Sequence, residues 1–434
     1  MRIILLSALA LTLAACAYPG TPPALAPITT AAAAPPGTTG QTSSVAQRSD
    51  DARAPVTILV SIDGFRPDYL HHGDTPHLDA IAAAGVSGSM YPSFPSITFP
   101  NHYTLVTGLR PDRNGIVSNT MEDPVKPGAL FQLSDSKITH DPDWWNEAEP
   151  LWVTAERAGI LSGTMFWPGS DLPIRGVRPH DWILYDADYT GAQRVRTVLD
   201  WLRRPAGERP GFITLYFDTV DKTSHHDGFY APQKTAAIRD VDAQIGVLQA
   251  GLAEIGRPVN LVIVSDHGMA PVPIDQRIDP ASVAPPATTR TLGWGPLVGV
   301  YPRDGVDPRT LDASVGRHAH DQCWRRESLP ARFHYGRNPR VAPVICLADT
   351  GWSFADRPAD YVRGDHGYDP RDPAMRALFL AQGPAFRSGR RLAPFDNVDV
   401  APLLRDLIGL PPGQGLDGTD RTFRAVLRPE RLDR

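Results

Sequence analysis

Four segments of this chain place aspartate, alone or with histidine, where a metal ion could be bound. They contain Asp63; Asp218, Asp221, His225 and His226; Asp266 and His267; and Asp365 and His366. The last two segments share the form Asp-His-Gly. A single such residue would be interpreted as a turn former or a cap. We interpret them as one site because the first three segments directly follow apolar runs, at equivalent places in the pattern.

The chemistry of these side chains favours a pair of metal ions. Crowded carboxylates would repel one another and would partly protonate, and a bound dication removes that conflict. Asp and His ligands without cysteine suit Zn²⁺ and, less closely, Mn²⁺ or Fe. Asp221 and His225 are four positions apart, so they share one face if their segment is helical. Six or seven ligands suffice for two metals, and two metals about 3.5–4 Å apart can clamp the attacking and departing oxygens of a phosphoryl transfer.

Thr98, in the stretch PSITFPNH, is the candidate nucleophile. Pro100 is tolerated in the first turn of a helix and Gly108 is a credible helix stop, so we expect a helix that begins at or just after Thr98. The N-terminus of a helix favours an anion such as a phosphate. Thr98 alone would be interpreted as an N-cap. Beside two metals we favour the nucleophile, because metal coordination activates an alcohol at neutral pH.

Alternating strands and helices are expected to position these residues. Residues 56–62, 211–217 and 259–265 are apolar runs without clean alternation, typical of strands covered on both faces. Between the second and third runs, apolar residues recur every three or four positions from Ile238 to Ile255, as in an amphipathic helix. Strand, helix, strand predicts a parallel sheet, whose strands present their carboxyl ends at one ligand-binding edge.

Composition restricts the class of protein. The chain has 434 residues, 42% hydrophobic and 21% charged, which is ordinary for a globular protein. Its length fits two average domains or one large α/β domain with insertions. The net charge of -5 and the pI near 6.2 argue against a protein that coats nucleic acid. They leave open a small anionic substrate held by metals, and they indicate no oligomeric state.

The N-terminus has the features of a bacterial export signal. One arginine and an apolar stretch from Ile3 to Ala15 form the two expected regions, and the stretch is short for a transmembrane span. LAAC, which ends at Cys16, resembles the lipobox, whose cysteine is lipidated; the alternative is a plain signal peptide with a cysteine nearby by chance. We therefore expect a signal peptide over residues 1–15 and a periplasmic-side protein, anchored to the membrane through Cys16.

Residues 16–53 are mostly Ala, Pro, Thr, Gly and Ser, and are predicted to form a disordered tether. Two cysteines remain, Cys323 and Cys346. In an oxidising compartment they most simply form one disulfide, and the alternative is two buried free thiols.

Seven ordered motifs resemble the nucleotide pyrophosphatase/phosphodiesterase family of the alkaline phosphatase superfamily, from about residue 56 to about residue 410. They are SIDGFRPDYL, PSFPSITFPNHYTLVTGLRPDRNGIVSN, FWPGS, DTVDKTSHHDG, VSDHGM, RFHYGRNPRVAPV and GDHGYDP. The resemblance implies an α/β fold, an alkaline-phosphatase-like three-layer sandwich with a largely parallel central sheet and inserted lobes. The catalytic domain is expected over 54–430. Within it, 120–190 and 270–360, rich in Trp, Pro and Arg, are predicted as substrate-facing lobes.

The resemblance also implies a role for each matching residue. One Zn²⁺ falls to Asp63, Thr98, Asp266 and His267, and the other to Asp221, His225 and His366. Thr98 becomes the nucleophile that forms a phospho-threonine, and Asn119 donates a hydrogen bond to a non-bridging phosphate oxygen. Phe99 and Tyr216 match aromatic positions near the leaving-group or nucleoside pocket. The preference for His225 over His226 comes from the resemblance, which also moves Asp218 away from the metals.

The expected activity is that of a two-zinc hydrolase, which cleaves phosphodiester or pyrophosphate bonds of nucleotide-type small molecules and releases nucleoside monophosphates. Asn119, as one neutral donor, suits the charge of a diester. A phosphonoacetate-type phosphonate hydrolase would need basic residues, and Lys126, Lys137 and Lys222 are the nearest candidates. A lysolipid or choline phosphodiesterase would need an anionic cluster for the quaternary amine. The non-enzymatic alternative is a tethered zinc-binding protein.

Overall fold

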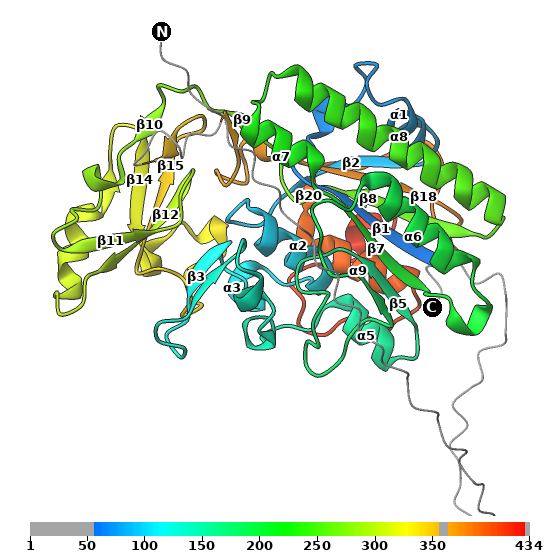
Figure 1. The fold of residues 1–434 in the computed structure, drawn as a ribbon, viewed down its shortest axis with the longest axis horizontal. Helices are drawn as coiled ribbons and strands as arrows, with labels where there is room; N and C mark the ends of the chain where they lie inside the picture. The colour runs from blue at the N-terminus through cyan, green and yellow to red at the C-terminus, as the bar shows by residue number, and fades with distance from the viewer. Residues whose placement is uncertain (1–55, 356–362, 430–434) are drawn as a thin grey trace, which may run out of the picture. The chain divides into compact units, whose positions relative to one another are not determined.

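A nine-stranded sheet forms the centre of the computed structural model (Figure 1), which describes residues 56–355 and 363–429. The predicted signal peptide, tether and lipidation site at Cys16 lie outside the described residues. The strands follow the order β19-β2-β18-β8-β1-β7-β5-β6, and β20 also pairs with β2. Their bounds are β1 (Val56–Ile62), β2 (Val86–Tyr91), β5 (Ser162–Met165), β6 (Asp181–Trp182), β7 (Phe212–Phe217), β8 (Val259–Val264), β18 (Ala377–Gln382), β19 (Arg390–Arg391) and β20 (Phe395–Asp396).

The sheet is largely parallel, as predicted. β18 is the exception, since it runs antiparallel to both of its neighbours, β8 and β2. β1 lies between β7 and β8 and is parallel to both. All seven of its residues are buried, which agrees with an apolar run that lacks alternation. Ile58, Val60 and Ile62 pack in one core and Leu59 in the other, on the opposite face of the sheet.

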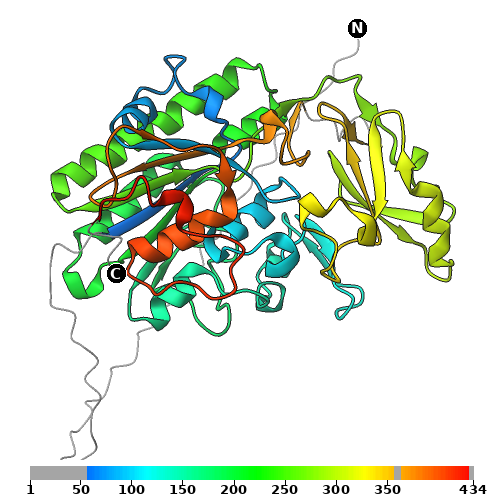
Figure 2. The ribbon, with the colours of Figure 1, turned by 180° about the vertical axis from the view of Figure 1, so that it is seen from behind.

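Helices cover both faces of this sheet and make three layers. The core that contains Ile58 also receives side chains from α1, α6 and α8, and the core that contains Leu59 receives them from α2, α5 and α9. Figures 1 and 2 show from opposite sides that α8 follows one face and α9 the other. The helices are α1 (Pro76–Ala84), α2 (Thr98–Thr107), α3 (Pro111–Asn114), α4 (Ser136–Thr139), α5 (Leu151–Arg157), α6 (Gly191–Arg203), α7 (Thr219–His226), α8 (Pro232–Ile255) and α9 (Val400–Leu407). No helix in the described ranges is both long and apolar enough to span a membrane.

A second, five-stranded antiparallel sheet lies within the segment predicted as the second lobe. Its strands are β11 (Thr289–Leu292), β12 (Leu297–Pro302), β13 (Gly316–Arg317), β14 (Asp321–Arg325) and β15 (Val344–Ala348). Cys323 of β14 and Cys346 of β15 face each other and are joined by the predicted disulfide. In the segment 120–190, by contrast, β5 and β6 extend the central sheet, so that stretch is not wholly an insertion.

Three short pairs complete the strands: β3 (Thr120–Glu122) with β4 (Leu130–Gln132), β9 (Ala270–Pro271) with β17 (Gly364–Asp365), and β10 (Arg277–Ile278) with β16 (Ser353–Phe354). The β9–β17 pair matters for the site, because it brings the segment that contains Asp365 and His366 beside the one that follows Asp266 and His267.

Candidate active site

Three parallel strands deliver the predicted residues to one edge of the central sheet. Ile62, the last residue of β1, is in register with Phe217, the last residue of β7, and Ser61 is in register with Val264 of β8. The residues that follow therefore emerge at the same level. The backbone N–H of Asp63 donates to the carbonyl of Phe217 over 2.9 Å, which holds the first of these ends against the second.

The first group of candidate ligands surrounds the imidazole of His267. Its Nε2 lies 3.0 Å from Oδ2 of Asp266, 3.4 Å from Oδ1 of Asp63 and 3.3 Å from the hydroxyl of Thr98. His267 and Asp266 are fully buried and Asp63 nearly so. Nδ1 of His267 faces the carbonyl of Gly268 at 2.9 Å, which fixes the ring and leaves Nε2 directed at the cluster.

The second group combines Asp221 and His225 of α7 with His366. Oδ1 of Asp221 lies 3.4 Å from Nε2 of His225 and 3.5 Å from Nε2 of His366. The rings of His366 and His267 stack with centroids 3.5 Å apart, so the two groups are contiguous. Asp221 and His225 share one face of α7, as their spacing of four predicts.

The donor atoms of these groups fit divalent cations. Oδ1 of Asp63, Oδ1 of Asp221 and Oδ2 of Asp266 are buried and accept no hydrogen bond, although imidazole nitrogens lie 3.0–3.5 Å from them. A buried carboxylate oxygen without a partner is costly, and a cation is the group that such an oxygen binds best. Asp221, His225 and His366 bring ligand atoms within 4.8 Å of one another, and so do Asp63, Asp221 and His267. The structure therefore contains two adjoining sets of side chains that could hold a metal ion.

The pKa shifts of the clustered carboxyl groups also favour a bound cation. Burial raises the pKa of the Asp63 carboxyl well above its usual range, and the Asp266 and Asp221 carboxylates raise it further. Burial acts in that direction on Asp266 too, but the imidazoles of His267 and His102 outweigh it and hold the pKa of Asp266 well below the usual range. The neighbours thus force unequal protonation on two adjacent carboxyl groups, a conflict that a bound dication would relieve.

In the second group, burial opposes ionisation of Asp221, but His225 and His366 outweigh it and bring the pKa of Asp221 to about 2. Burial lowers the pKa of His225, yet Asp221 outweighs burial and raises that pKa to about 9. Burial and the neighbouring His267 lower the pKa of His366 to about 3. His366 is therefore neutral at neutral pH, which is the form of imidazole that binds a metal.

Thr98 is the first residue of α2, as the Pro100 and Gly108 pattern predicts. Ile97 precedes it in extended backbone, and Gly108 ends the helix in a left-handed conformation. The Thr98 hydroxyl faces His267, and the residue as a whole is 7% exposed. The N-cap position is occupied by Ile97, whose apolar side chain cannot cap the helix, so Thr98 is not the N-cap.

Asn119 is held beside Thr98 by the helix itself. The backbone N–H of Phe99 donates to Oδ1 of Asn119 over 2.9 Å. Because Oδ1 is used in this way, the NH₂ group is the part of the amide that can donate elsewhere. The geometry therefore agrees with the donor role expected for Asn119.

The two predicted aromatic positions differ from each other. Phe99 is partly buried and packs on Phe131 and Trp145, with centroids 6.0 and 5.8 Å away. Tyr216 is 9% exposed, and its hydroxyl donates to Oδ2 of Asp63 over 2.5 Å. The structure thus shows Tyr216 bound to a candidate ligand, and its expected place near a substrate pocket stays a prediction. Tyr216 is the second-to-last residue of β7, and its buried hydroxyl holds the candidate ligand Asp63 in place.

The structure also separates the aspartates and histidines that spacing could not rank. Asp218 forms a buried ion pair with Arg194 at 2.9 Å and a further one with Lys222 at 2.5 Å, so its charge is used within the fold. The side chain of His226 is 89% exposed, whereas His225 lies beside Asp221. Spacing and the resemblance are thus consistent with the geometry at His225.

Two residues near the site were not predicted. His102 is fully buried in α2, and its Nδ1 lies 3.2 Å from Oδ2 of Asp266 and 3.0 Å from the carbonyl of Thr98. Its position four residues after Thr98 was the available signal. Trp294 is 59% exposed, and its ring centroid is 6.5 Å from that of His225. The glycines on both sides of Trp294 have positive φ angles, and only the turn they make brings this side chain there.

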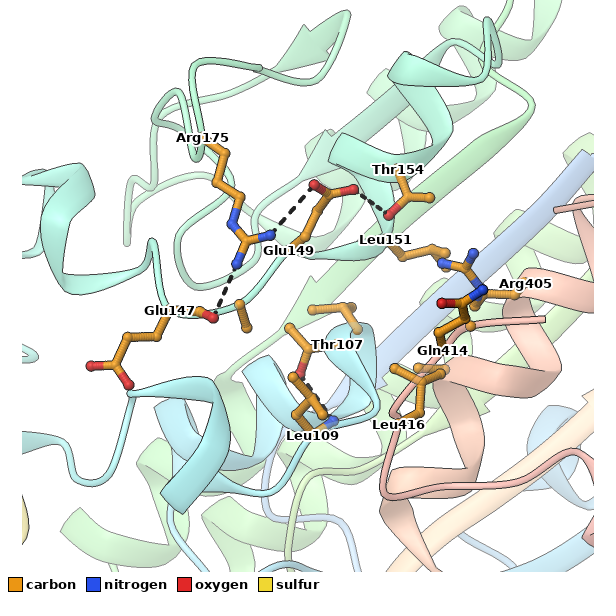
Figure 3. A pocket seen from close by; sticks show the side chains of 14 residues that line it. Thr107, Leu109, Glu147, Glu149, Leu151, Thr154, Arg175, Arg405, Gln414 and Leu416 are labelled. Atoms are coloured by element: carbon orange, nitrogen blue, oxygen red, sulfur yellow. Dashed lines mark hydrogen bonds and ion pairs between the residues drawn. The ribbon is translucent and has the colours of Figure 1, made fainter. Parts of the chain in front are cut away.

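A separate cavity of about 320 Å³ lies at the other end of α2 (Figure 3). Thr107 and Leu109 line it, with Glu149, Arg175 and Arg405. It contains none of the predicted site residues. The Glu149 carboxylate is bound by Thr154 and Arg157, so its charge is already compensated. The size of a cavity is therefore a poor guide to the chemistry of this chain, which is concentrated at the strand ends.

Known proteins resemble this chain in sequence and in fold. Residues 57–369 match the family model described as type I phosphodiesterase / nucleotide pyrophosphatase. An uncharacterised pyrophosphatase/phosphodiesterase of Schizosaccharomyces pombe is 37% identical over 387 residues, which cover 83% of this chain and 78% of that protein. The bis(5'-adenosyl)-triphosphatase of Xenopus laevis is 34% identical, over 87% of this chain and 82% of that protein.

Human ectonucleotide pyrophosphatase/phosphodiesterase family member 1 is 35% identical over 86% of this chain, which spans only 42% of that longer protein. Among solved structures, human ectonucleotide pyrophosphatase/phosphodiesterase 5 superposes with a TM-score of 0.81 at 33% identity, over 86% of this chain and all of that one. An inactive variant of the murine protein, solved in complex with AMP, has the same TM-score at 32% identity.

Proposed function

Since the chain belongs to the type I phosphodiesterase / nucleotide pyrophosphatase family of hydrolases, we propose that it is a two-zinc enzyme acting on small nucleotide-type substrates. It cleaves their phosphodiester or pyrophosphate bonds through a phospho-threonine and releases nucleoside monophosphates. The observation that carries this proposal is the position of Thr98. It is the first residue of α2, and its hydroxyl lies beside His267 and near buried carboxylate oxygens that accept no hydrogen bond.

The proposed ligands are those that lie together at the sheet edge. Asp63, Thr98, Asp266 and His267 would hold one ion, and Asp221, His225 and His366 the other. Bound there, Zn²⁺ supplies Lewis-acid chemistry that favours ionisation of an alcohol and neutralises charge on a phosphoryl group. Asp and His donors without sulfur support Zn²⁺ among the available metals.

The chain's own residues position the reacting groups. The Thr98 oxygen attacks phosphorus, the bond to the departing oxygen breaks, and water later hydrolyses the phospho-threonine so that the hydroxyl is restored. The free NH₂ of Asn119 would donate to a non-bridging oxygen, since its carbonyl is held by Phe99. One neutral donor suits the single negative charge of a diester. Tyr216 and His102 orient Asp63 and Asp266 from behind.

The contacts of the candidate lysines argue against the closest alternative function, that of a phosphonate hydrolase that would bind a carboxylate. Lys222 is paired with Asp218 and also donates to the hydroxyl of Tyr185. Lys126 is paired with Asp141 and Asp143. Two of the three candidate lysines are therefore already bound to other groups. The phosphonate hydrolase and the choline phosphodiesterase remain alternatives to be tested by substrate preference.

A substrate panel tests the proposal directly. Zinc-loaded protein is assayed with a nitrophenyl nucleotide diester, a dinucleotide joined by a pyrophosphate, a nitrophenyl monoester, nitrophenyl phosphocholine and phosphonoacetate. We expect the first two to be preferred by orders of magnitude in kcat/KM. Preference for any of the others would overturn the proposal. Thr98→Ala should lose hydrolysis of every substrate at unchanged metal content, and loss without that control would not distinguish an enzyme from a zinc-binding protein.

The expected location at the bacterial cell envelope is part of the same proposal. Its support is the LAAC motif that ends at Cys16. Growth with a radiolabelled fatty acid should label the wild-type chain and leave Cys16→Ser unlabelled, with the variant released from the membrane fraction. Equal labelling of the two chains would contradict the anchor.

A further inference from the structure

A further cluster of candidate metal ligands lies in the five-stranded sheet, in residues that the proposed hydrolysis does not use. Nδ1 of His318 is 2.6 Å from Oδ1 of Asp321. Sγ of Cys323 is 3.5 Å from that carboxylate oxygen and 3.9 Å from that imidazole nitrogen. The three ligand atoms all lie within 4.8 Å of one another. A nitrogen, an oxygen and a sulfur donor therefore converge on one point.

The fold holds these donors in place through a tight hairpin. His318 and Asp321 stand on either side of the turn between β13 and β14, and the backbone N–H of His318 donates to the carbonyl of Asp321 over 2.9 Å. Cys323 follows on β14 and is in register with Cys346 on the adjacent strand β15 (Figure 1). Both cysteines are fully buried and Asp321 is 2% exposed. Burial of a carboxylate beside two sulfurs is costly unless it is paired, and here the imidazole is its partner.

We propose that this cluster is a redox-dependent zinc site. In the disulfide form each sulfur lacks the thiolate charge that a metal needs. A dithiol reductant transfers two electrons and two protons to the Cys323–Cys346 bond, breaks it into two thiols and itself becomes a disulfide. Zn²⁺ then displaces the two thiol protons and is held by both thiolates, by Nδ1 of His318 and by the Asp321 carboxylate. This donor set is one that tetrahedral zinc accepts.

The site would join β14 to β15 in the reduced chain as the disulfide does in the oxidised chain. It is independent of the proposed function, because none of its residues belongs to the active site. It also implies that the metal content of this protein depends on its redox history. A preparation kept reduced should bind one more metal ion per chain than an oxidised one.

Cobalt is the probe that separates this site from the active site. Thiolate bound to Co²⁺ gives intense near-ultraviolet charge-transfer absorption, whereas the active-site candidates contain no sulfur donor. The full chain is prepared as Cys16→Ser, so that Cys323 and Cys346 are its only cysteines. One half is kept reduced with a phosphine from lysis onward, the other is oxidised, and thiol titration verifies both states. Metal-free samples are then titrated with Co²⁺.

We expect the charge-transfer band in the reduced sample alone, saturating with one equivalent of cobalt beyond that bound by the oxidised sample. His318→Asn should weaken cobalt binding at this site at least about tenfold, because one of four ligands is lost. His320→Asn is the matched control, since that ring stacks on Trp352 at 3.5 Å and lies outside the cluster. Active-site turnover should be the same in both variants, which verifies their folding.

Two results would overturn the proposal. One is a reduced chain with two titratable thiols that gives no charge-transfer band. The other is a band of equal affinity in His318→Asn, Asp321→Asn and wild type, which would mean that the two thiolates bind cobalt without the cluster.

Discussion

Tyr216→Phe is the sharpest test of how the active site is supported. The change removes the hydroxyl that donates to Oδ2 of Asp63 and leaves the ring, which packs edge-on against His102 with centroids 5.1 Å apart. Burial and the adjacent Asp63 raise the pKa of Tyr216 well above its usual range, so this hydroxyl remains a donor across the working pH. The substitution therefore deletes one hydrogen bond at constant shape.

The size of the effect follows from that bond. A hydrogen bond to a charged group contributes about 1.5–3 kcal/mol, and a partner that orients a metal ligand contributes roughly 10–100-fold in metal affinity. Without the hydroxyl, Asp63 can rotate away from the position that presents Oδ1 to the cluster. We expect zinc affinity to fall about tenfold to a hundredfold, with kcat/KM at saturating zinc much closer to wild type. Competition with a zinc indicator, followed by kinetics at controlled free zinc, measures both quantities.

Tyr335→Phe is the matched control. It removes a buried hydroxyl that donates to the carbonyl of Val117 over 2.9 Å, without touching a candidate ligand. Zinc affinity equal to wild type in both variants would refute the proposed role of Tyr216. Unchanged zinc affinity, together with a raised KM for nucleotide substrates, would instead favour the substrate-binding role that the sequence resemblance implied.

Three further predictions concern single side chains. His225→Ala should lose about one zinc per chain, whereas His226→Ala, at a side chain that is 89% exposed, should match wild type; metal analysis that reverses this order would contradict the ligand choice. Asn119→Ala should lower kcat/KM about 10²–10³-fold at full zinc occupancy, and a variant with wild-type kinetics would remove Asn119 from the site. Burial raises the pKa of Asp399, so its protonated form stabilises the fold at low pH and this contribution is lost as the pH rises through that raised pKa. The unfolding temperature of wild type relative to Asp399→Asn should therefore fall as the pH rises above the ordinary range of an aspartate, and a constant difference would contradict this assignment.

Much of the fold was predictable because its signals are local. The apolar run before Asp63 is a fully buried strand, and the stretch from Thr98 to Gly108 begins and ends a helix where proline and glycine indicated. The pairing of Cys323 with Cys346 followed from the count of cysteines and the expected compartment. Strand ends that share one edge explain why Asp63, Asp266 and their neighbours meet.

Residues that act through a neighbour were harder to predict. Tyr216 was placed near the substrate, but the direction of its hydroxyl depends on Asp63, which is distant in sequence. His102 was missed because its partner Asp266 belongs to another strand end. Trp294 stands on a turn of two glycines that carries no periodic pattern. In each case the determining contact is tertiary, and neither periodicity nor composition contains it.

The place of β2 in the central sheet has a consequence for the C-terminal part of the chain. β2 leads directly into the segment that contains Thr98, yet all the strands paired with it among the described residues, β18, β19 and β20, come from positions 377–396. A chain truncated before those positions would contain the nucleophile and every candidate ligand, but β2 would lack all of these partner strands. We therefore expect activity to require this C-terminal part of the chain, although none of the candidate site residues belongs to it.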